Sequence, residues 1–284
     1  MEDGLSVKLA NKKCLFLCST FNGLSQKFWV NFSSLFKESH LMLRINPAAI
    51  KAFQPHLIIC PFLEDFIPDQ IWSAIPCFIV HPGPADEAGP SVLNWAILEG
   101  KTHWSVTIIQ ADAQWDAGPV WAQAKFKLPV ASLSSIYRQQ VSDTALQLLP
   151  QALSRYYSEK KPLLTAPPVY RIRITQQQLR IIWDRPSAEI IKKIHAGDSK
   201  PGAPAMIEDN DYLLFGAQTG ESTPHLSAFR PGEIITQQDG QICVRTSDGC
   251  VWISRMADIT ENIKIRPADL LAQSASTITR VIVK

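Results

Sequence analysis

The sequence predicts an α/β protein in two parts, a doubly wound domain with a parallel sheet followed by a small antiparallel β domain. Three observations predict this class. Apolar runs recur through the first half, helical patterns separate several of them, and two Asp-Gly turns divide apolar runs near the carboxyl end. The length of 284 residues accommodates one domain of about 150–180 residues and a smaller one.

The predicted strands of the first half are short apolar runs. None of them alternates between polar and apolar residues, which is typical of strands that are buried on both faces of a sheet. Because parallel strands need long crossover connections, helices are expected between them. The runs cover residues 14–18, 41–45, 57–60, 77–80 and 106–109.

Helices are predicted where apolar residues recur at intervals of three and four. The segment 25–38 has this spacing. The segment 91–98 begins with Ser91, a residue type that caps the amino ends of helices, directly after Gly89-Pro90. A long amphipathic helix is expected at 134–157. Together with the strands, these helices give the alternation of a doubly wound domain.

The composition changes after Tyr157. A proline-rich stretch follows, which we interpret as a linker. The predicted organisation is an α/β domain at 1–164, a linker at 165–178 and a small β domain at 179–284.

The carboxyl-terminal part has the signals of an antiparallel sheet. A short helix is expected first, at 187–196. Asp-Gly pairs at 239–240 and 248–249 then separate three apolar runs, and this spacing predicts hairpins in a small antiparallel sheet or open barrel. The three runs cover residues 234–236, 242–245 and 251–253.

Composition argues against several classes of function. The net charge is +2, and the 28 lysines and arginines are spread along the chain instead of forming the dense basic cluster of a nucleic-acid surface. No stretch approaches the roughly 18 apolar residues of a membrane span, and the acidic first residues do not form a signal peptide. Six cysteines without a CxxC pair indicate reduced thiols and a cytoplasmic protein. No cysteine or histidine pair has the spacing of a metal site.

His81 and Asp116 are the candidate catalytic residues. Each follows an apolar run, at the point where a predicted buried strand gives way to a loop. Ligands of open α/β sheets bind at that edge, and a histidine and a carboxylate brought together there can exchange protons with a substrate. The alternative is a capped loop histidine and a turn aspartate without chemistry.

The order of several motifs resembles that of the folate-dependent formyltransferases, the superfamily of methionyl-tRNA formyltransferase. The closer resemblance is to the formyltransferase half of the hydrogenase-maturation factors called HypX or HoxX. It runs from about Lys13 to about Arg266. The matching segments are 21–27, 61–63, 67–68, 71–72, 80–91, 116–122, 134–138, 196–202, 231–235 and 251–253.

This resemblance implies a Rossmann-like formyltransferase domain followed by a small OB-like open barrel. It also implies 10-formyltetrahydrofolate as the formyl donor and the thiol of coenzyme A as the acceptor. In HypX a second, crotonase-like domain releases carbon monoxide for the iron of [NiFe] hydrogenase. This chain has no room for that domain, so we expect it to perform the formyl transfer alone and to depend on a separate crotonase-like domain or on other hydrogenase-maturation proteins.

The resemblance also implies roles for individual residues. A His81 N–H would stabilise the oxyanion formed at the formyl carbon, and Asp116 would hold the imidazole tautomer and relay a proton. Pro61, Phe62 and Leu63 would frame the flat pteridine of the donor, with plain core packing as the alternative, and Asp112 would contact the donor as well.

Two further residues are assigned to the acceptor. Gln26 opens the helix after the first strand, where backbone N–H groups meet ligands; the alternative is a solvated residue of the first turn. Ser199 lies in a tight turn before Pro201-Gly202, where a turn-forming role is the alternative.

Three departures from the family pattern leave the acceptor open. Ile79 stands where the general formyltransferases have an asparagine, which argues against formylation of an amine on methionyl-tRNA or a nucleotide sugar. An arginine of HypX is missing from 85–89, and two further cations are missing at Pro129 and Leu133. Losing cations weakens a site for the phosphates of coenzyme A. Two alternatives therefore stand beside transfer to coenzyme A: an enzyme that formylates an amine, and a folate-binding or scaffold protein without catalysis.

Overall fold

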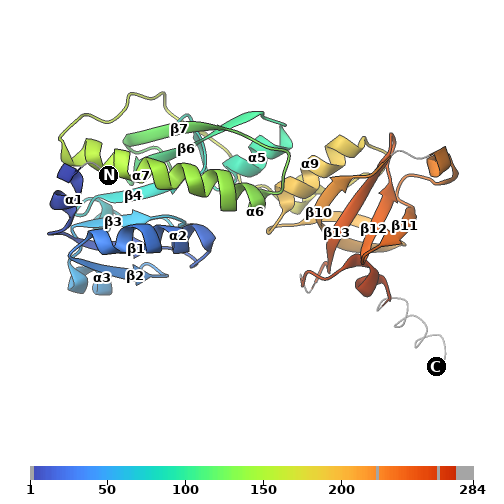
Figure 1. Ribbon diagram of the computed structural model, residues 1–284, viewed down its shortest axis with the longest axis horizontal. Helices are drawn as coiled ribbons and strands as arrows, with labels where there is room; N and C mark the ends of the chain where they lie inside the picture. Colours follow the sequence, from blue (N-terminus) through green and yellow to red (C-terminus); the bar gives the residue numbers. More distant parts are fainter. Residues whose placement is uncertain (1–2, 222–223, 261–262, 273–284) are drawn as a thin grey trace. The chain divides into compact units, whose positions relative to one another are not determined.

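The computed structural model describes residues 3–221, 224–260 and 263–272. They form two compact units, which are drawn in Figure 1. The first comprises Met1–Val92, Thr102–Pro129 and Ile136–Arg173, and the second comprises Leu93–Lys101, Val130–Ser135 and Ile174–Lys284. Within the described ranges, no helix is both long and apolar enough to cross a membrane.

The first unit is built on a six-stranded mixed sheet. Its first four strands in the chain run parallel, but β6 pairs antiparallel with β4, and β7 pairs antiparallel with β6. In spatial order the strands are β2 (Glu38–Met42), β1 (Lys13–Leu17), β3 (Leu57–Cys60), β4 (Cys77–His81), β6 (His103–Gln110) and β7 (Val120–Lys127). The predicted α/β class is confirmed, whereas the prediction of a wholly parallel sheet is wrong.

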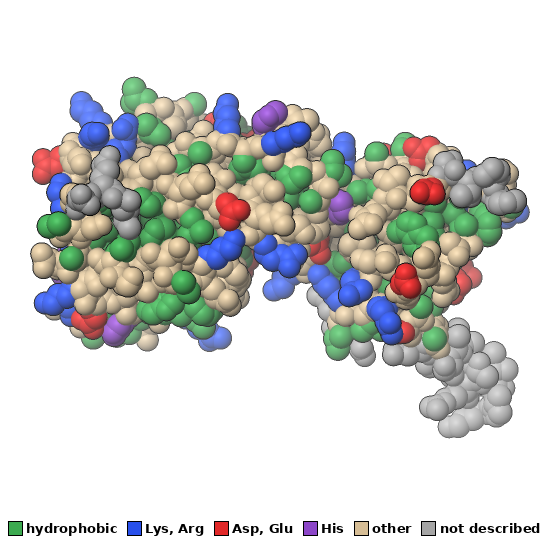
Figure 2. Space-filling model, in the orientation of Figure 1, with side chains coloured by type: hydrophobic (Ala, Val, Ile, Leu, Met, Phe, Trp, Pro, Cys, Tyr) green, Lys and Arg blue, Asp and Glu red, His purple; other side chains and the backbone are tan. Residues whose placement is uncertain are grey.

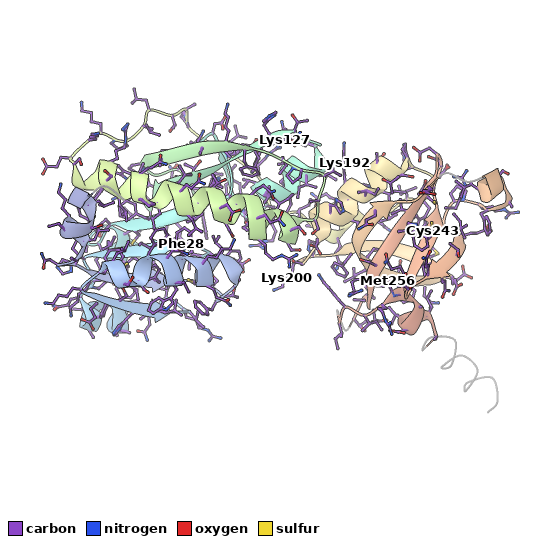
Figure 3. All side chains as sticks on the ribbon, in the orientation of Figure 1. Phe28, Lys127, Lys192, Lys200, Cys243 and Met256 are labelled. Carbon is purple, nitrogen blue, oxygen red and sulfur yellow. The ribbon has the colours of Figure 1, made fainter. Side chains whose placement is uncertain are left out.

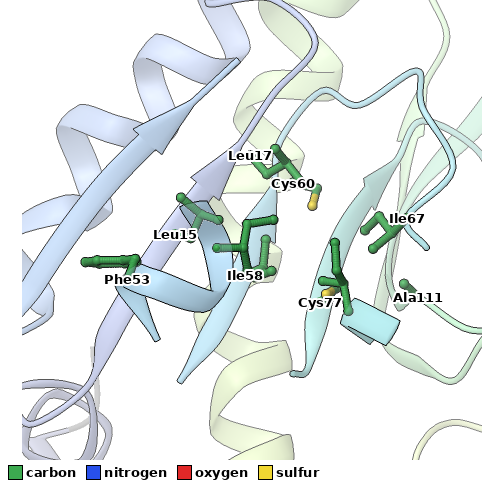
Figure 4. Packing of buried hydrophobic residues seen from close by; sticks show 10 residues of the cluster. Leu15, Leu17, Phe53, Ile58, Cys60, Ile67, Cys77 and Ala111 are labelled. Carbon is green, nitrogen blue, oxygen red and sulfur yellow. The ribbon is translucent and has the colours of Figure 1, made fainter. Parts of the chain in front are cut away.

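Helices cover both faces of this sheet (Figure 1). On one face lie α2 (Gly23–Phe32) and α7 (Ser142–Tyr157), and Trp29 of α2 contacts Phe16 edge-on with 5.4 Å between ring centroids. On the other face, α3 (Pro47–Phe53) supplies Ile50 and Phe53 to the buried cluster drawn in Figure 4. Two short helices of this unit are α1 (Asp3–Leu9) and α4 (Asp69–Trp72), whereas α5 (Val92–Leu98) belongs, beyond its first residue, to the second unit.

Two predicted boundaries near β2 are wrong. The helix expected at 25–38 ends at Phe32 and is followed by a 3₁₀ turn, Ser33–Leu35. The strand expected at 41–45 is β2, which begins at Glu38. Phe36 continues the apolar spacing of the helix in the sequence. It is apolar because its ring packs against Phe16, although it lies beyond the end of α2. The edge strand carries no apolar run because it is only half-buried.

The helical run expected at 134–157 is present with an irregularity. It begins as α6 (Leu133–Ile136), continues through a π-helical turn at Tyr137–Val141, and proceeds as α7. Such turns occur often at functional sites. The Tyr137 ring in this turn contacts Phe62 edge-on, with 6.3 Å between centroids.

The second unit holds an antiparallel sheet, as predicted, but the sheet has five strands, because β9 and β10 join the three that the sequence indicated. The hairpin at Asp239-Gly240 has both residues at positive φ, 53° and 78°, as a two-residue hairpin turn of type I′ requires. Cys243 and Met256 lie on two of its strands (Figure 3). The helix α9 (Ser187–Gly197) packs on the sheet. The strand order is β11 (Ile234–Gln238), β12 (Gln241–Arg245), β13 (Cys250–Asp258), β10 (Asn210–Thr219) and β9 (Ala203–Ile207).

Asp198 is a buried carboxylate that follows α9. It accepts hydrogen bonds from the Ser134 side chain and, at 3.4 Å, from the Ser134 backbone N–H, and Lys264 Nζ lies 3.5 Å away. Burial raises the pKa of Asp198, but these hydrogen bonds and the lysine charge outweigh burial and hold the pKa below its ordinary 3.8. The ionised form therefore stabilises the fold above that pH, and this contribution is lost as the pH falls below it.

We expect Asp198→Asn to lower the free energy of unfolding by about 1.5–3 kcal/mol at pH 7, because a hydrogen-bonded charge is replaced by a neutral amide. The difference from the unaltered protein should shrink as the pH falls below about 4. Denaturant unfolding at pH 7 and at about pH 2 measures both effects, because the contribution is lost only as the pH falls through the lowered pKa of the folded protein. Asp211→Asn, in an exposed ion pair with Arg180, is the control and should change stability by less than about 1 kcal/mol. An equal effect of Asp198→Asn at both pH values would contradict the prediction.

Acidic, basic and hydrophobic side chains are interspersed on the face of the protein drawn in Figure 2. This distribution agrees with the small net charge of +2 and with basic residues that are spread along the chain.

Candidate functional site

His81 is the last residue of β4 and is 2% exposed. Its Nε2 lies 2.7 Å from the backbone carbonyl oxygen of Glu87. A carbonyl oxygen only accepts hydrogen bonds, so Nε2 carries a proton and donates it. The other ring nitrogen, Nδ1, lies 3.6 Å from Oδ2 of Asp116. Both nitrogens of the buried imidazole are thus directed by neighbouring groups.

The sequence did not predict the path of the loop that brings Asp116 to His81. Because β6 is antiparallel to β4, its last residue, Gln110, lies opposite Phe78 and not beside His81. We expected both polar groups to follow strands that end at the same edge of the sheet. This expectation is wrong, because β4 and β6 run in opposite directions. The loop 111–119 instead turns back to bring Asp116 to the end of β4.

The backbone of this loop is tightly constrained. Asp116 has a left-handed φ of 50°, a conformation that aspartate tolerates better than most residues. Two residues later, a Cβ on Gly118 would lie 1.9 Å from the carbonyl oxygen of Gln110. Only glycine fits at that position, so the Asp-Ala-Gly sequence fixes the return path of the loop.

The carboxylate of Asp116 is mostly buried, and one of its two oxygens accepts a backbone hydrogen bond. Its Oδ2 accepts the Gly89 N–H at 2.9 Å and faces His81, and 15% of the side chain is exposed. Within the described residues, no hydrogen bond or ion pair uses Oδ1. With Nε2 protonated, a neutral imidazole would direct the lone pair of Nδ1 at the carboxylate. Nδ1 and Oδ2 therefore face each other at a distance slightly longer than a hydrogen bond.

A small cavity lies beside Asp116. Its volume is about 30 Å³, which is room for a single water molecule. Two half-exposed aromatic side chains line it, Phe66 and Trp115, whose ring centroids are 5.3 Å apart. The other lining residues include Leu63, Ile67, Ile79 and Asp112.

The structure places the other predicted site residues as follows. Leu63 and Asp112 line the cavity, whereas Pro61 is buried and Phe62 packs against Tyr137. Gln26 is exposed on α2, and its Nε2 donates to the carbonyl oxygen of Phe21 at 3.0 Å. Ser199 belongs to the second unit, where it is exposed in the turn after α9 with a φ of 72°.

Sequence reasoning missed the groups that hold the pair in place. These are the Glu87 carbonyl, the Gly89 N–H and the glycine at position 83, where a Cβ would lie 2.6 Å from Nε2 of His81. The available signals were the His-Pro-Gly and Gly-Pro turns, but the sequence does not show what a turn's backbone contacts. A larger cavity of about 590 Å³ lies between α7 and β7 and is lined by neither His81 nor Asp116.

Two protein-family descriptions match the chain. "Formyl transferase" matches residues 3–153, and "Formyl transferase, C-terminal domain" matches residues 173–273. Among curated proteins, the hydrogenase maturation factor HoxX of Bradyrhizobium diazoefficiens is 31% identical over 93% of this chain and 48% of its own length. A methionyl-tRNA formyltransferase of Fervidobacterium nodosum is 26% identical over 72% of this chain and 66% of its own length.

Solved structures give the same relationship. HypX from Aquifex aeolicus in complex with tetrahydrofolic acid has a TM-score of 0.86 and 32% identity, and covers 92% of this chain and 47% of the HypX chain. The methionyl-tRNA formyltransferase from Clostridium thermocellum, at 16% identity and a TM-score of 0.60, shares the fold. The chain thus spans about half the length of the HoxX and HypX proteins that it matches.

Proposed function

Because this chain belongs to the formyl transferase family, we propose that it transfers a formyl group from 10-formyltetrahydrofolate to an acceptor. The observation that carries the proposal is the buried His81–Asp116 pair, with 3.6 Å between Nδ1 and Oδ2, beside a cavity that Asp116 itself lines. A histidine and a carboxylate beside a cavity can move a proton between an attacking nucleophile and a leaving amine, as acyl transfer uses.

The donor is proposed from the likeness to HypX, which was solved with tetrahydrofolic acid. Its pterin would lie in the cavity beside Asp116, against Leu63, Ile67 and Asp112. A volume of about 30 Å³ does not hold a pterin, so the proposal requires the loop 112–117 with Trp115 to move outward when the donor binds. Trp115 is 43% exposed and can move without opening the core.

In the proposed reaction, Asp116 takes up the proton of the acceptor, and His81 stabilises the oxyanion. The acceptor attacks the formyl carbon and gives its proton to Oδ1 of Asp116, and the carbonyl oxygen becomes an oxyanion. For this step His81 starts with a proton on Nδ1 as well as on Nε2, and it donates through Nδ1 to that oxyanion, a contribution of about 3–4 kcal/mol for a preorganised donor. The carbon–nitrogen bond then breaks, and the proton on Asp116 passes to N10 of the departing tetrahydrofolate.

The thiol of coenzyme A is the proposed acceptor, because the chain resembles HypX and HoxX over nearly its whole length. Ile79 supports a thiol over an amine acceptor. It lines the cavity but offers no hydrogen bond at the position where amine formyltransferases have an asparagine. Formyl-coenzyme A would then serve a crotonase-like domain that releases carbon monoxide for hydrogenase maturation. We place this reaction in the cytoplasm, because all six cysteines are free thiols.

Incubation with 10-formyltetrahydrofolate tests the proposal. We expect tetrahydrofolate to appear only when coenzyme A is present, together with one equivalent of formyl-coenzyme A measured by mass spectrometry. Parallel reactions with methionyl-tRNA and with an amino-sugar nucleotide test the amine alternative. Donor that binds but stays intact with every thiol and amine would refute transfer and favour a folate-binding scaffold.

A further inference from the structure

A short segment after α7 is paired with the loop that follows His81. The strap, defined as Val169–Arg171, contains β8 (Val169–Tyr170), which runs parallel to β5 (Glu87–Ala88). The Val169 N–H donates to the Asp86 carbonyl at 2.8 Å, and the Arg171 N–H donates to the Ala88 carbonyl at 2.7 Å. The strap lies in the first unit and inside the segment that the sequence predicted to be a linker.

An ion pair reinforces this backbone ladder. Arg171 Nε lies 3.0 Å from Oε2 of Glu87, and the two side chains are 27% and 18% exposed. The backbones also approach closely at Gly89, which has a φ of 114° and where a Cβ would lie 2.2 Å from the carbonyl oxygen of Arg171. The three residues of the strap are therefore in direct contact with the four successive loop residues 86–89.

The residues held by the strap are those that touch the reacting pair. The backbone carbonyl of Glu87 accepts the Nε2 proton of His81 at 2.7 Å, and the N–H of Gly89 donates to Asp116 at 2.9 Å. The backbone carbonyls of Asp86 and Ala88 accept hydrogen bonds from the strap. The residues that alternate with them, Glu87 and Gly89, direct their own backbone groups at His81 and Asp116. Because the strap holds the backbone of residues 86–89 in place, it also holds the Glu87 carbonyl against His81 and the Gly89 N–H against Asp116.

We propose that Arg171 is a positioning residue for formyl transfer: through Glu87 it holds the carbonyl that keeps the His81 proton on Nε2 and turns Nδ1 toward Asp116. The Glu87 carbonyl takes the place that a buried carboxylate has in hydrolase triads, where it orients the histidine and selects its tautomer. This inference rests on the proposed function, because it takes His81 and Asp116 as the reacting pair.

The test compares Arg171→Ala with Arg171→Lys and with Arg173→Ala. Arg173 is an exposed arginine two residues later and lies outside the ladder, so it is the matched control. We expect Arg171→Ala to lower kcat by about 10- to 100-fold, because small displacements of a catalytic group have effects of that size. The KM for 10-formyltetrahydrofolate should change less than kcat, Arg171→Lys should recover part of the rate, and Arg173→Ala should leave it unchanged.

Nitrogen NMR of the His81 imidazole gives a second readout that does not depend on turnover. At a pH where the His81 imidazole is neutral, the unaltered protein should show its one proton on Nε2, and Arg171→Ala should show a mixture of tautomers at an unchanged melting temperature. If Arg171→Ala unfolds the protein, Glu87→Gln, which keeps the side-chain length and removes the charge, takes its place. An unprotonated Nε2 in the unaltered protein, or the same tautomer and kcat in the variants, would overturn the inference. Absence of formyl transfer in the unaltered protein, with the Nε2 proton present and sensitive to Arg171, would refute only the proposed function.

Discussion

Replacing Asp116 with asparagine is expected to lower kcat for formyl transfer by about 10²- to 10⁴-fold, the usual contribution of a positioned acid–base group. Asparagine keeps the shape of the side chain and accepts the left-handed φ of 50° at this position. Its amide oxygen can still accept the Gly89 N–H. It cannot take a proton from the acceptor or return one to the leaving amine, so the loss falls on the chemical step.

The measurement is kcat at saturating donor, together with the dissociation constant of tetrahydrofolate. We expect tetrahydrofolate to bind with little change, because the cavity keeps its shape. Asp69→Asn, at the exposed amino end of α4, is a matched control and should leave kcat unchanged. An Asp116→Asn protein that keeps kcat within about threefold of the unaltered protein would remove Asp116 from the proposed proton transfer.

Gly83→Ala is expected to displace His81 although it leaves every catalytic side chain in the sequence. The added Cβ would lie 2.6 Å from Nε2 of His81 and 3.0 Å from a methyl carbon of Val92. His81 is 2% exposed, so its ring has no free space into which it could retreat. The imidazole must therefore leave the Glu87 carbonyl or Asp116, and we expect kcat to fall by about 100-fold, since a displacement near 1 Å has that effect.

The measurement is kcat together with the melting temperature, which separates a displaced histidine from an unfolded protein. Gly4→Ala is the control, because a Cβ at that helical position meets nothing within 4 Å. Equal kcat values for Gly83→Ala and the unaltered protein would show that the imidazole does not need its present position.

The sequence predicted the strands that are buried but not the direction of all of them. The apolar runs of β1, β3 and β4 were read correctly, because central strands covered on both faces show no alternation. The strand β6 is buried in the same way although it is antiparallel, so burial alone could not give its direction. The edge strand β7 was missed, because its second half alternates between exposed and partly buried residues without a long apolar run.

The candidate pair could be proposed from the sequence, whereas its surroundings could not. His81 and Asp116 are side chains next to recognisable turns, and the family resemblance drew attention to both. The groups that orient them are backbone atoms of Glu87 and Gly89, and these are held by Arg171, more than eighty residues away in the chain. Backbone contacts of this kind depend on the path of the chain and not on residue type. The roles of Gln26 and Ser199 stay predictions.

The burial of the cysteines has a consequence for the proposed transfer of a formyl group to a thiol. All six are buried. Burial raises the pKa of Cys77 to about 12 and raises that of Cys60 as well, where neighbouring thiols add to the effect. Sulfur attacks a formyl group as the thiolate, which these side chains rarely form at neutral pH. The protein is therefore expected to avoid formylating itself, so that repeated turnover with a thiol acceptor leaves its own mass unchanged.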